Sequence, residues 1–234
     1  MQKDPSWELA NQIAVQQRVQ HGTFWPLFEP LPQSNDRVPG YLVLLNLDPR
    51  KAGPAVSLVL ECSRKSSNPY QEIGRLLDKP DWRPQLVAAV ALAALGYDEN
   101  TFIKLWAAFD SGSWVAPQLA AVACLRDPNF ADHARVRINS RCPVNDSRMN
   151  SMSPLERHVS EGPAGTGQRS AKAAASLISL LRLLHQQPEW LTAELLSPDL
   201  AALLSADIDQ SGTIATGWSS NLKAVFKMLT IKID

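Results

Sequence analysis

The stretch that decides the fold is WRPQLVAAVALAAL at residues 82–95, an apolar run with an alanine-rich middle. Its central pattern occurs three times without gaps, at residues 56–60 (VSLVL), 88–92 (AAVAL) and 120–124 (AAVAC), at a constant offset of 32 residues. A helix of this length is not stable alone in water, so each copy must bury a face against neighbouring helices. The run therefore predicts a helix that recurs through the chain.

A second pattern precedes each copy at the same offset. It comprises residues 44–46 (LLN), 76–78 (LLD) and 108–110 (AFD), and Trp82 aligns with Trp114. Each unit is thus a helix that ends in two apolar residues and Asn or Asp, a short joint, and a second apolar helix. One such pair cannot bury its hydrophobic face, whereas stacked pairs share a continuous core.

This pattern resembles the HEAT and armadillo class of α-solenoids over about residues 40–138. The resemblance implies an all-α fold, a short α-solenoid of antiparallel helical hairpins, with an irregular helical group at the C-terminus. It also implies a scaffold that binds partners along an extended face, without naming a substrate. The alternative interpretation is a helical bundle whose similar helices align by chance.

Polar caps followed by proline support the helical interpretation. A cap side chain accepts a hydrogen bond from a free backbone N–H, and proline suits the first helical position. The pairs are Asp4-Pro5, Asp48-Pro49, Asn68-Pro69, Asp127-Pro128, Ser153-Pro154 and Ser197-Pro198. With the apolar periodicity they predict helices at about residues 5–20, 41–47, 52–63, 69–78, 82–95, 99–110, 114–126, 128–138, 170–186, 188–196, 198–206 and 219–230.

These elements predict one domain in four parts. Residues 1–39 form an N-terminal helix and a capping segment rich in proline and aromatic residues, and residues 40–138 form the helical-repeat region. Residues 139–169 form a flexible loop, because Ser, Pro, Gly, Asn and Arg dominate there. Residues 170–234 form the C-terminal helical group.

Composition narrows the classes of function. The chain has 234 residues, 45% of them apolar, and 23 basic against 23 acidic residues. Without a cationic excess, general nucleic-acid binding is not expected. Three widely spaced cysteines indicate a reducing compartment, so we expect a cytoplasmic protein. The longest apolar run, residues 86–95, is about half the length that a bilayer core requires, so we expect no membrane partner.

The sequence favours a non-catalytic protein–protein interaction module, such as an adaptor or an inhibitor of the bacterial immunity type. Residues 183–222 carry five acids and neither Lys nor Arg, which favours a basic protein as partner. The predicted contact residues are mainly aromatic, since aromatic side chains carry much interface energy: Trp25, Phe28, Trp82, Arg83, Trp114 and Gln118. The alternative role of the stretch at residues 24–32 is to cover one end of the helical stack.

An enzyme is disfavoured rather than excluded, and no catalytic residue is predicted. Asp132 and His133 are neighbours in sequence, which does not place their side chains for relay chemistry. Some HEAT-like proteins are DNA glycosylases, and this is the alternative function, with Arg135, Arg137 and Arg141 as a local basic patch. Residues 162–170 resemble a P-loop but lack its lysine, so they predict a Gly-rich linker instead.

A second alternative is calcium binding. Residues 207–214 match the first eight positions of an EF-hand loop, in which Asp207, Asp209 and Ser211 supply oxygen ligands. The twelfth position holds Trp218 instead of a bidentate Glu, so we expect weak binding at best. The competing interpretation is an ordinary turn between two helices. No other cofactor is predicted.

Overall fold

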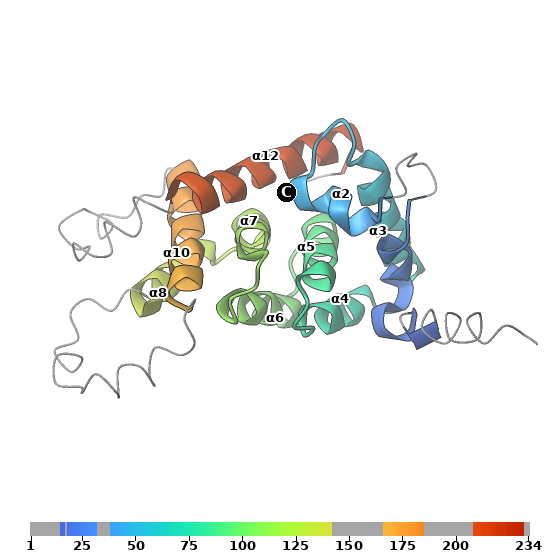
Figure 1. Cartoon of the computed structure of the whole chain (residues 1–234), viewed down its shortest axis with the longest axis horizontal. Coiled ribbons are helices and arrows are strands. Elements are labelled where there is room, and N and C mark those ends of the chain that lie inside the picture. The colour runs from blue at the N-terminus through green and yellow to red at the C-terminus, as the bar shows by residue number, and fades with distance from the viewer. Residues whose placement is uncertain (1–14, 17, 32–37, 142–165, 185–207, 232–234) are drawn as a thin grey trace, which may run out of the picture. The chain divides into compact units, whose positions relative to one another are not determined.

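A computed structural model describes residues 15–16, 18–31, 38–141, 166–184 and 208–231, and their secondary structure is helical (Figure 1). The elements are the 3-10 helix η1 (Gly22–Phe28), α2 (Gly40–Asn46), α3 (Gly53–Lys65), α4 (Pro69–Leu77), α5 (Trp82–Leu95), α6 (Glu99–Asp110), α7 (Ala116–Arg126), α8 (Phe130–Arg141), α10 (Thr166–Leu183), the π-helical turn η4 (Ile208–Gly212) and α12 (Thr213–Met228). Within these ranges the sole β-type pairing is an isolated bridge between Pro30 and Pro39. The predicted all-α class is confirmed.

Two compact units make up the chain. One comprises residues 1–105 and 221–234, and the other comprises residues 106–220. This division differs from the predicted boundaries at residues 39, 138 and 169. The helices predicted at residues 188–196 and 198–206, most of the one at residues 5–20, and most of the loop at residues 139–169 lie outside the described residues.

The first unit is built around α5. Residues 84–93 of this helix are buried throughout, as the run of Ala, Val and Leu predicts. Helices α2, α3 and α4 pack against α5, and η1 packs against α3. The start of α4 has the predicted cap, because the Asn68 side chain accepts from the backbone N–H of Gln71 and Pro69 occupies the first turn.

The thiol of Cys62 belongs to this core. Cys62 on α3 is 2% exposed, which agrees with its interpretation as a small apolar residue. Burial, together with the charge of Glu61, raises the pKa of its thiol to about 11. Since the thiolate is the reactive form, Cys62 is inert at neutral pH.

The second unit centres on α10, which packs against α7, α8 and η4. Residues 116–123 of α7 and residues 173–178 of α10 are buried, and most of them are small. Alanine at these positions lets two helix backbones approach closely. Gly212 extends this pattern into η4, since a Cβ placed there would lie 2.1 Å from Oγ of Ser179.

The last helix begins earlier than the sequence predicts. Helix α12 starts at Thr213 and continues directly from η4, whereas the predicted helix begins at residue 219. Its buried residues include Ala215, Trp218, Leu222 and Phe226, whose spacing of three or four residues marks one helical face. Burial of Ala215 and Trp218 therefore extends the helix into the segment interpreted as a loop.

Membrane crossing requires a helix that is both long and strongly apolar. None of the helices in the described ranges meets both conditions.

Candidate functional site

Aromatic side chains from three elements form a row in the first unit, which we call the aromatic cluster: His21, Trp25, Phe28, Tyr41 and Trp82. The ring of His21 stacks on Phe28 at a centroid distance of 3.8 Å and on Trp25 at 6.0 Å. Phe28 lies 5.8 Å from Tyr41, and Tyr41 meets the edge of Trp82 at 5.8 Å. The rings are all half-buried, so each keeps some surface toward solvent.

The 3-10 helix η1 carries Trp25 and Phe28, and His21 directly precedes it. Its own anchors, Phe24 and Leu27, are fully buried, and η1 packs against α3. The backbone N–H and the hydroxyl of Thr23 both donate to Oε2 of Glu72, at 3.0 and 2.6 Å. Gly22 begins η1 with a φ of 55°, a conformation that glycine adopts without strain. With one face held in this way, η1 presents Trp25 and Phe28 on its other side.

A cation lies at one end of the aromatic cluster. The guanidinium of Arg83 is 4.9 Å from the centroid of Trp82 and 5.8 Å from that of Tyr41, within the range of cation–π attraction. A hydrogen bond with Tyr41 is the main cause that raises the pKa of Arg83. Arg83 also pairs with Asp81 at 3.1 Å. The end formed by Trp82 and Arg83 thus offers an aromatic face and a positive charge together.

Charged groups also lie at the other end of the aromatic cluster. The indole N–H of Trp25 donates to Oε1 of Glu29 at 3.0 Å, and Arg18 lies 4.0 Å from the same oxygen. Both charged side chains are about half exposed or more. The arrangement is an apolar centre with a polar rim, which is typical of protein interfaces.

Four of the predicted contact residues come together in or beside this cluster: Trp25, Phe28, Trp82 and Arg83. The other two lie in the second unit, where Trp114 is 68% exposed and Gln118 is 5% exposed. Of that pair, therefore, Trp114 alone offers its side chain to solvent. Sequence reasoning missed His21, although it lies only four residues before Trp25 and seven before Phe28.

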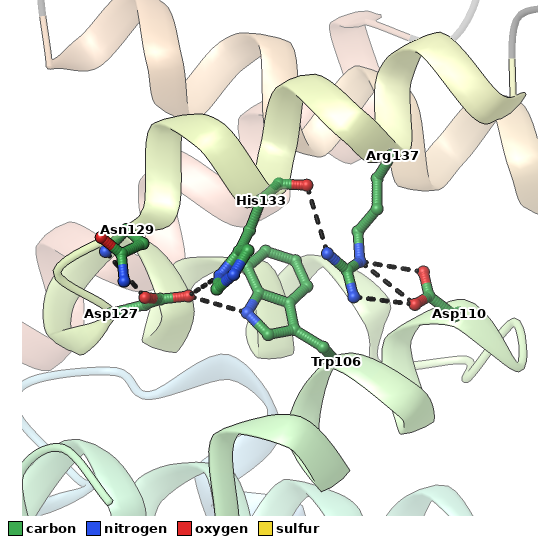
Figure 2. A network of polar contacts seen from close by, with 6 residues as sticks. All are labelled: Trp106, Asp110, Asp127, Asn129, His133 and Arg137. Carbon is green, nitrogen blue, oxygen red and sulfur yellow. Dashed lines mark hydrogen bonds and ion pairs between the residues drawn. The ribbon is translucent and has the colours of Figure 1, made fainter. Parts of the chain in front are cut away.

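The second unit contains a polar network around a buried acid (Figure 2). The side chain of Asp127 is 0% exposed. It accepts from the indole N–H of Trp106 at 2.8 Å and from the backbone N–H of Asn129 at 2.9 Å, and it contacts Nδ1 of His133 at 2.7 Å. A carboxylate held by three N–H groups is well compensated for its burial.

Arg137 closes the other side of this network, as Figure 2 shows. Its guanidinium stacks 4.1 Å from the ring centroid of Trp106 and binds Asp110 through two N–H groups, with Nε at 3.1 Å and Nη2 at 3.0 Å. It also donates to the backbone carbonyl of His133 at 3.2 Å. The indole of Trp106 is therefore held between α8 side chains, which fastens α8 to the end of α6.

The network pairs His133 with Asp127, not with its sequence neighbour Asp132. Because Asp127 accepts at Nδ1, the neutral ring carries its proton there and leaves Nε2 as an acceptor. The His133 side chain is 42% exposed, whereas the acid is wholly enclosed. Such a pair orients an imidazole, and Asp127 also holds the turn before α8 through the backbone N–H of Asn129.

The residues of the two alternative functions lie only partly within the described part of the chain. Arg137 of the predicted basic patch is paired with Asp110, while Arg135 is exposed and the Arg141 side chain lies outside the described residues. Of the predicted calcium ligands, Asp207 and the Asp209 side chain also lie outside them. Ser211 is buried in η4, where its carbonyl accepts from the hydroxyl of Ser176 at 3.4 Å. Among the described side chains, no group of three or more His, Cys, Asp and Glu is placed to hold a metal ion.

The aromatic cluster is the stronger candidate for a site that meets another molecule. Its rings reach the surface and stand beside charged side chains, whereas the network encloses its acid and joins two helices. Comparison with models of protein families, with curated proteins and with solved structures gave no match for this chain.

Proposed function

We propose that this protein is a non-catalytic protein-interaction module that binds a partner protein through the aromatic cluster. The observation that carries the proposal is the row of half-buried rings from η1, α2 and α5, ending at Arg83. Tryptophan, tyrosine and arginine are the residues that most often dominate binding energy at protein interfaces. In this cluster a rigid element holds each ring, so little conformational entropy is lost when a partner docks.

The proposed scaffold is a short HEAT-like solenoid of helical hairpins. Helices α2, α4 and α6, the first helices of the three sequence repeats, end at residues 46, 77 and 110, which are 31 and 33 residues apart. The second helices of the first two repeats, α3 and α5, pack against each other. This spacing and packing support the sequence period of 32 residues as a structural period.

Equivalent ion pairs also support a repeating arrangement. Asp78, which follows α4, pairs with Lys104 on α6, and Asp110 at the end of α6 pairs with Arg137 on α8. The partners are 26 and 27 residues apart in the two cases. Each acid thus binds the first helix of the following hairpin, which is the contact that stacking of like units requires.

The Lys104 and Arg137 stems occupy matching places as well. Lys104 lies against Gly74, four residues before Asp78, where a Cβ would approach its Cδ at 3.1 Å. Arg137 stacks on Trp106, which lies four residues before Asp110. In both repeats, therefore, the residue four positions before the acid contacts the side chain of the cation that pairs with that acid. This favours a solenoid over a chance alignment of similar helices.

Within this class, an adaptor or an inhibitor of the immunity type fits the features best. The acidic composition of residues 183–222 favours a basic partner, because opposite charges speed the encounter of two proteins. The binding energy itself would come from the aromatic cluster.

Replacing Trp82 with alanine tests the proposal. We expect capture of a stoichiometric protein partner from native lysate by the wild-type chain, and a loss of affinity of about tenfold or more in Trp82→Ala, since buried aromatic anchors contribute about 2 kcal/mol or more. Affinity is measured by titration of the captured partner, and circular dichroism checks the fold. Tyr97→Ala is the matched control, because Tyr97 is an exposed aromatic residue of the same unit outside the cluster. Equal affinities for all three chains, or repeated absence of a partner, would contradict the proposal.

A further inference from the structure

His21 is the one imidazole inside the aromatic cluster, and its position is unusual for a polar side chain. Its ring lies nearly parallel to those of Phe28 and Trp25, at interplanar angles of 16° and 17°. Its Nδ1 atom is buried and has no hydrogen-bond partner among the described residues. In the neutral ring this nitrogen can stay unprotonated, with the ring's one proton on Nε2.

Protonation of His21 would destabilise this buried arrangement of the ring. It would place an N–H donor and a positive charge at a buried position where the described residues provide no acceptor. Attraction between a cation and the two ring faces would favour the charged form, whereas burial of the ring opposes it. Burial accordingly lowers the pKa of His21 below its ordinary value of 6.5, and the charge of Lys79 adds to this effect.

The charged groups around His21 come from every element that packs near it. Asp81 is an acid whose charge opposes the lowering, and it is engaged with Arg83. Glu72 on α4 is engaged by Thr23, and Arg18 and Glu29 pair on the same segment as His21. On α3 the Glu61–Lys65 pair is exposed, and α2 contributes the ring of Tyr41. Most of the nearby acids therefore already have partners of their own.

We propose that His21 makes the aromatic cluster a pH-sensitive docking surface, ordered while the ring is neutral and loosened when it is protonated. This inference rests on the proposed function of the cluster. With a folded-state pKa below the unfolded value, His21 contributes stability that is complete above pH 6.5 and is lost as the pH falls through the folded-state value. Loosening the ring of His21 would release its contacts with Phe28 and Trp25, which are predicted partner contacts.

The first experiment uses the free full-length chain, so it does not depend on a partner. The ring protons of His21 and the indole N–H of Trp25 are followed by NMR as the pH is lowered from about 7.5 to about 4.5. We expect His21 to titrate below pH 6.5, and the Trp25 resonance to shift with the same midpoint. Removing the neighbouring charge in Lys79→Gln should move both midpoints to higher pH.

Two variants separate His21 from the other histidines. In His21→Phe the aromatic stack is kept without a titratable group, so the pH dependence of Trp25 should disappear. His158→Gln is the matched control, because it removes a histidine outside the described residues and should leave that dependence unchanged. A His21 midpoint at or above 6.5, or a Trp25 transition that persists in His21→Phe, would overturn the inference.

The second experiment addresses docking. For the partner protein captured by the wild-type chain, affinity should fall at least severalfold between about pH 7.5 and about pH 5 with the wild-type chain, but not with His21→Phe. An equal fall with both chains would overturn the docking part of the inference. Failure to find a partner would instead contradict the proposed function, since the NMR titration reports on His21 in the free chain.

Discussion

Asp127→Asn is expected to lower the free energy of unfolding by about 3 kcal/mol. The Asp127 carboxylate is fully enclosed, and three N–H groups from Trp106, Asn129 and His133 converge on it. An asparagine has nearly the same shape but no negative charge. Its NH2 group cannot accept a hydrogen bond, so it leaves one or two of these N–H donors without an acceptor. The exposed side of His133 reduces the loss somewhat, because water can reach that ring. Denaturant unfolding followed by circular dichroism measures the change.

Asp132→Asn is the matched control for this prediction. It makes the same chemical change five residues further along, next to His133 in sequence, at an exposed position on α8. Its cost should stay below about 1 kcal/mol, the usual value of an acid near a helix N-terminus. If the two variants lost equal stability, Asp127 would not be the organising acid of the network.

Gly212→Ala is expected to destabilise the second unit by about 2 kcal/mol, a typical cost of overpacking. The added Cβ would lie 2.1 Å from Oγ and 2.9 Å from Cβ of Ser179 on α10, and 3.6 Å from the carbonyl of Ala175. Rotation of the Ser179 hydroxyl relieves the first clash but not the second, so η4 and α10 must move apart. Thermal unfolding monitored by circular dichroism measures the effect.

Gly217→Ala is the control, because it makes the same change one turn into α12, where no atom of the described residues beyond its own helix and chain neighbours lies within 4 Å of the new Cβ. Since alanine is the better helix former, this variant should be more stable than wild type by about 0.5–1 kcal/mol. Ser179→Ala should rescue part of the loss in Gly212→Ala. Equal effects at the two glycines would show that helix propensity, and not the approach of η4 to α10, determines the result.

Parts of the candidate site could be predicted from the sequence and parts could not. Trp25, Phe28 and Trp82 could be identified from the sequence because aromatic side chains often dominate the binding energy of interfaces. That Tyr41 joins them between η1 and α5 depends on how three elements pack, and no local pattern encodes it. Similarly, Asp132 is the neighbour of His133 in sequence, but the turn at residues 127–129 brings Asp127 to its ring instead.

The sequence by itself determined the helical class and most helix positions. Local signals suffice for these, since the apolar period, the Asn68 cap and the alanine-rich runs act within a few residues of one another. Tertiary structure alone decided the partners of His21 and His133, and it extended α12 back to Thr213 through burial of Ala215 and Trp218. The physical reason is that burial and pairing are interactions between segments distant in the chain, and they override the turn preference of a short polar stretch.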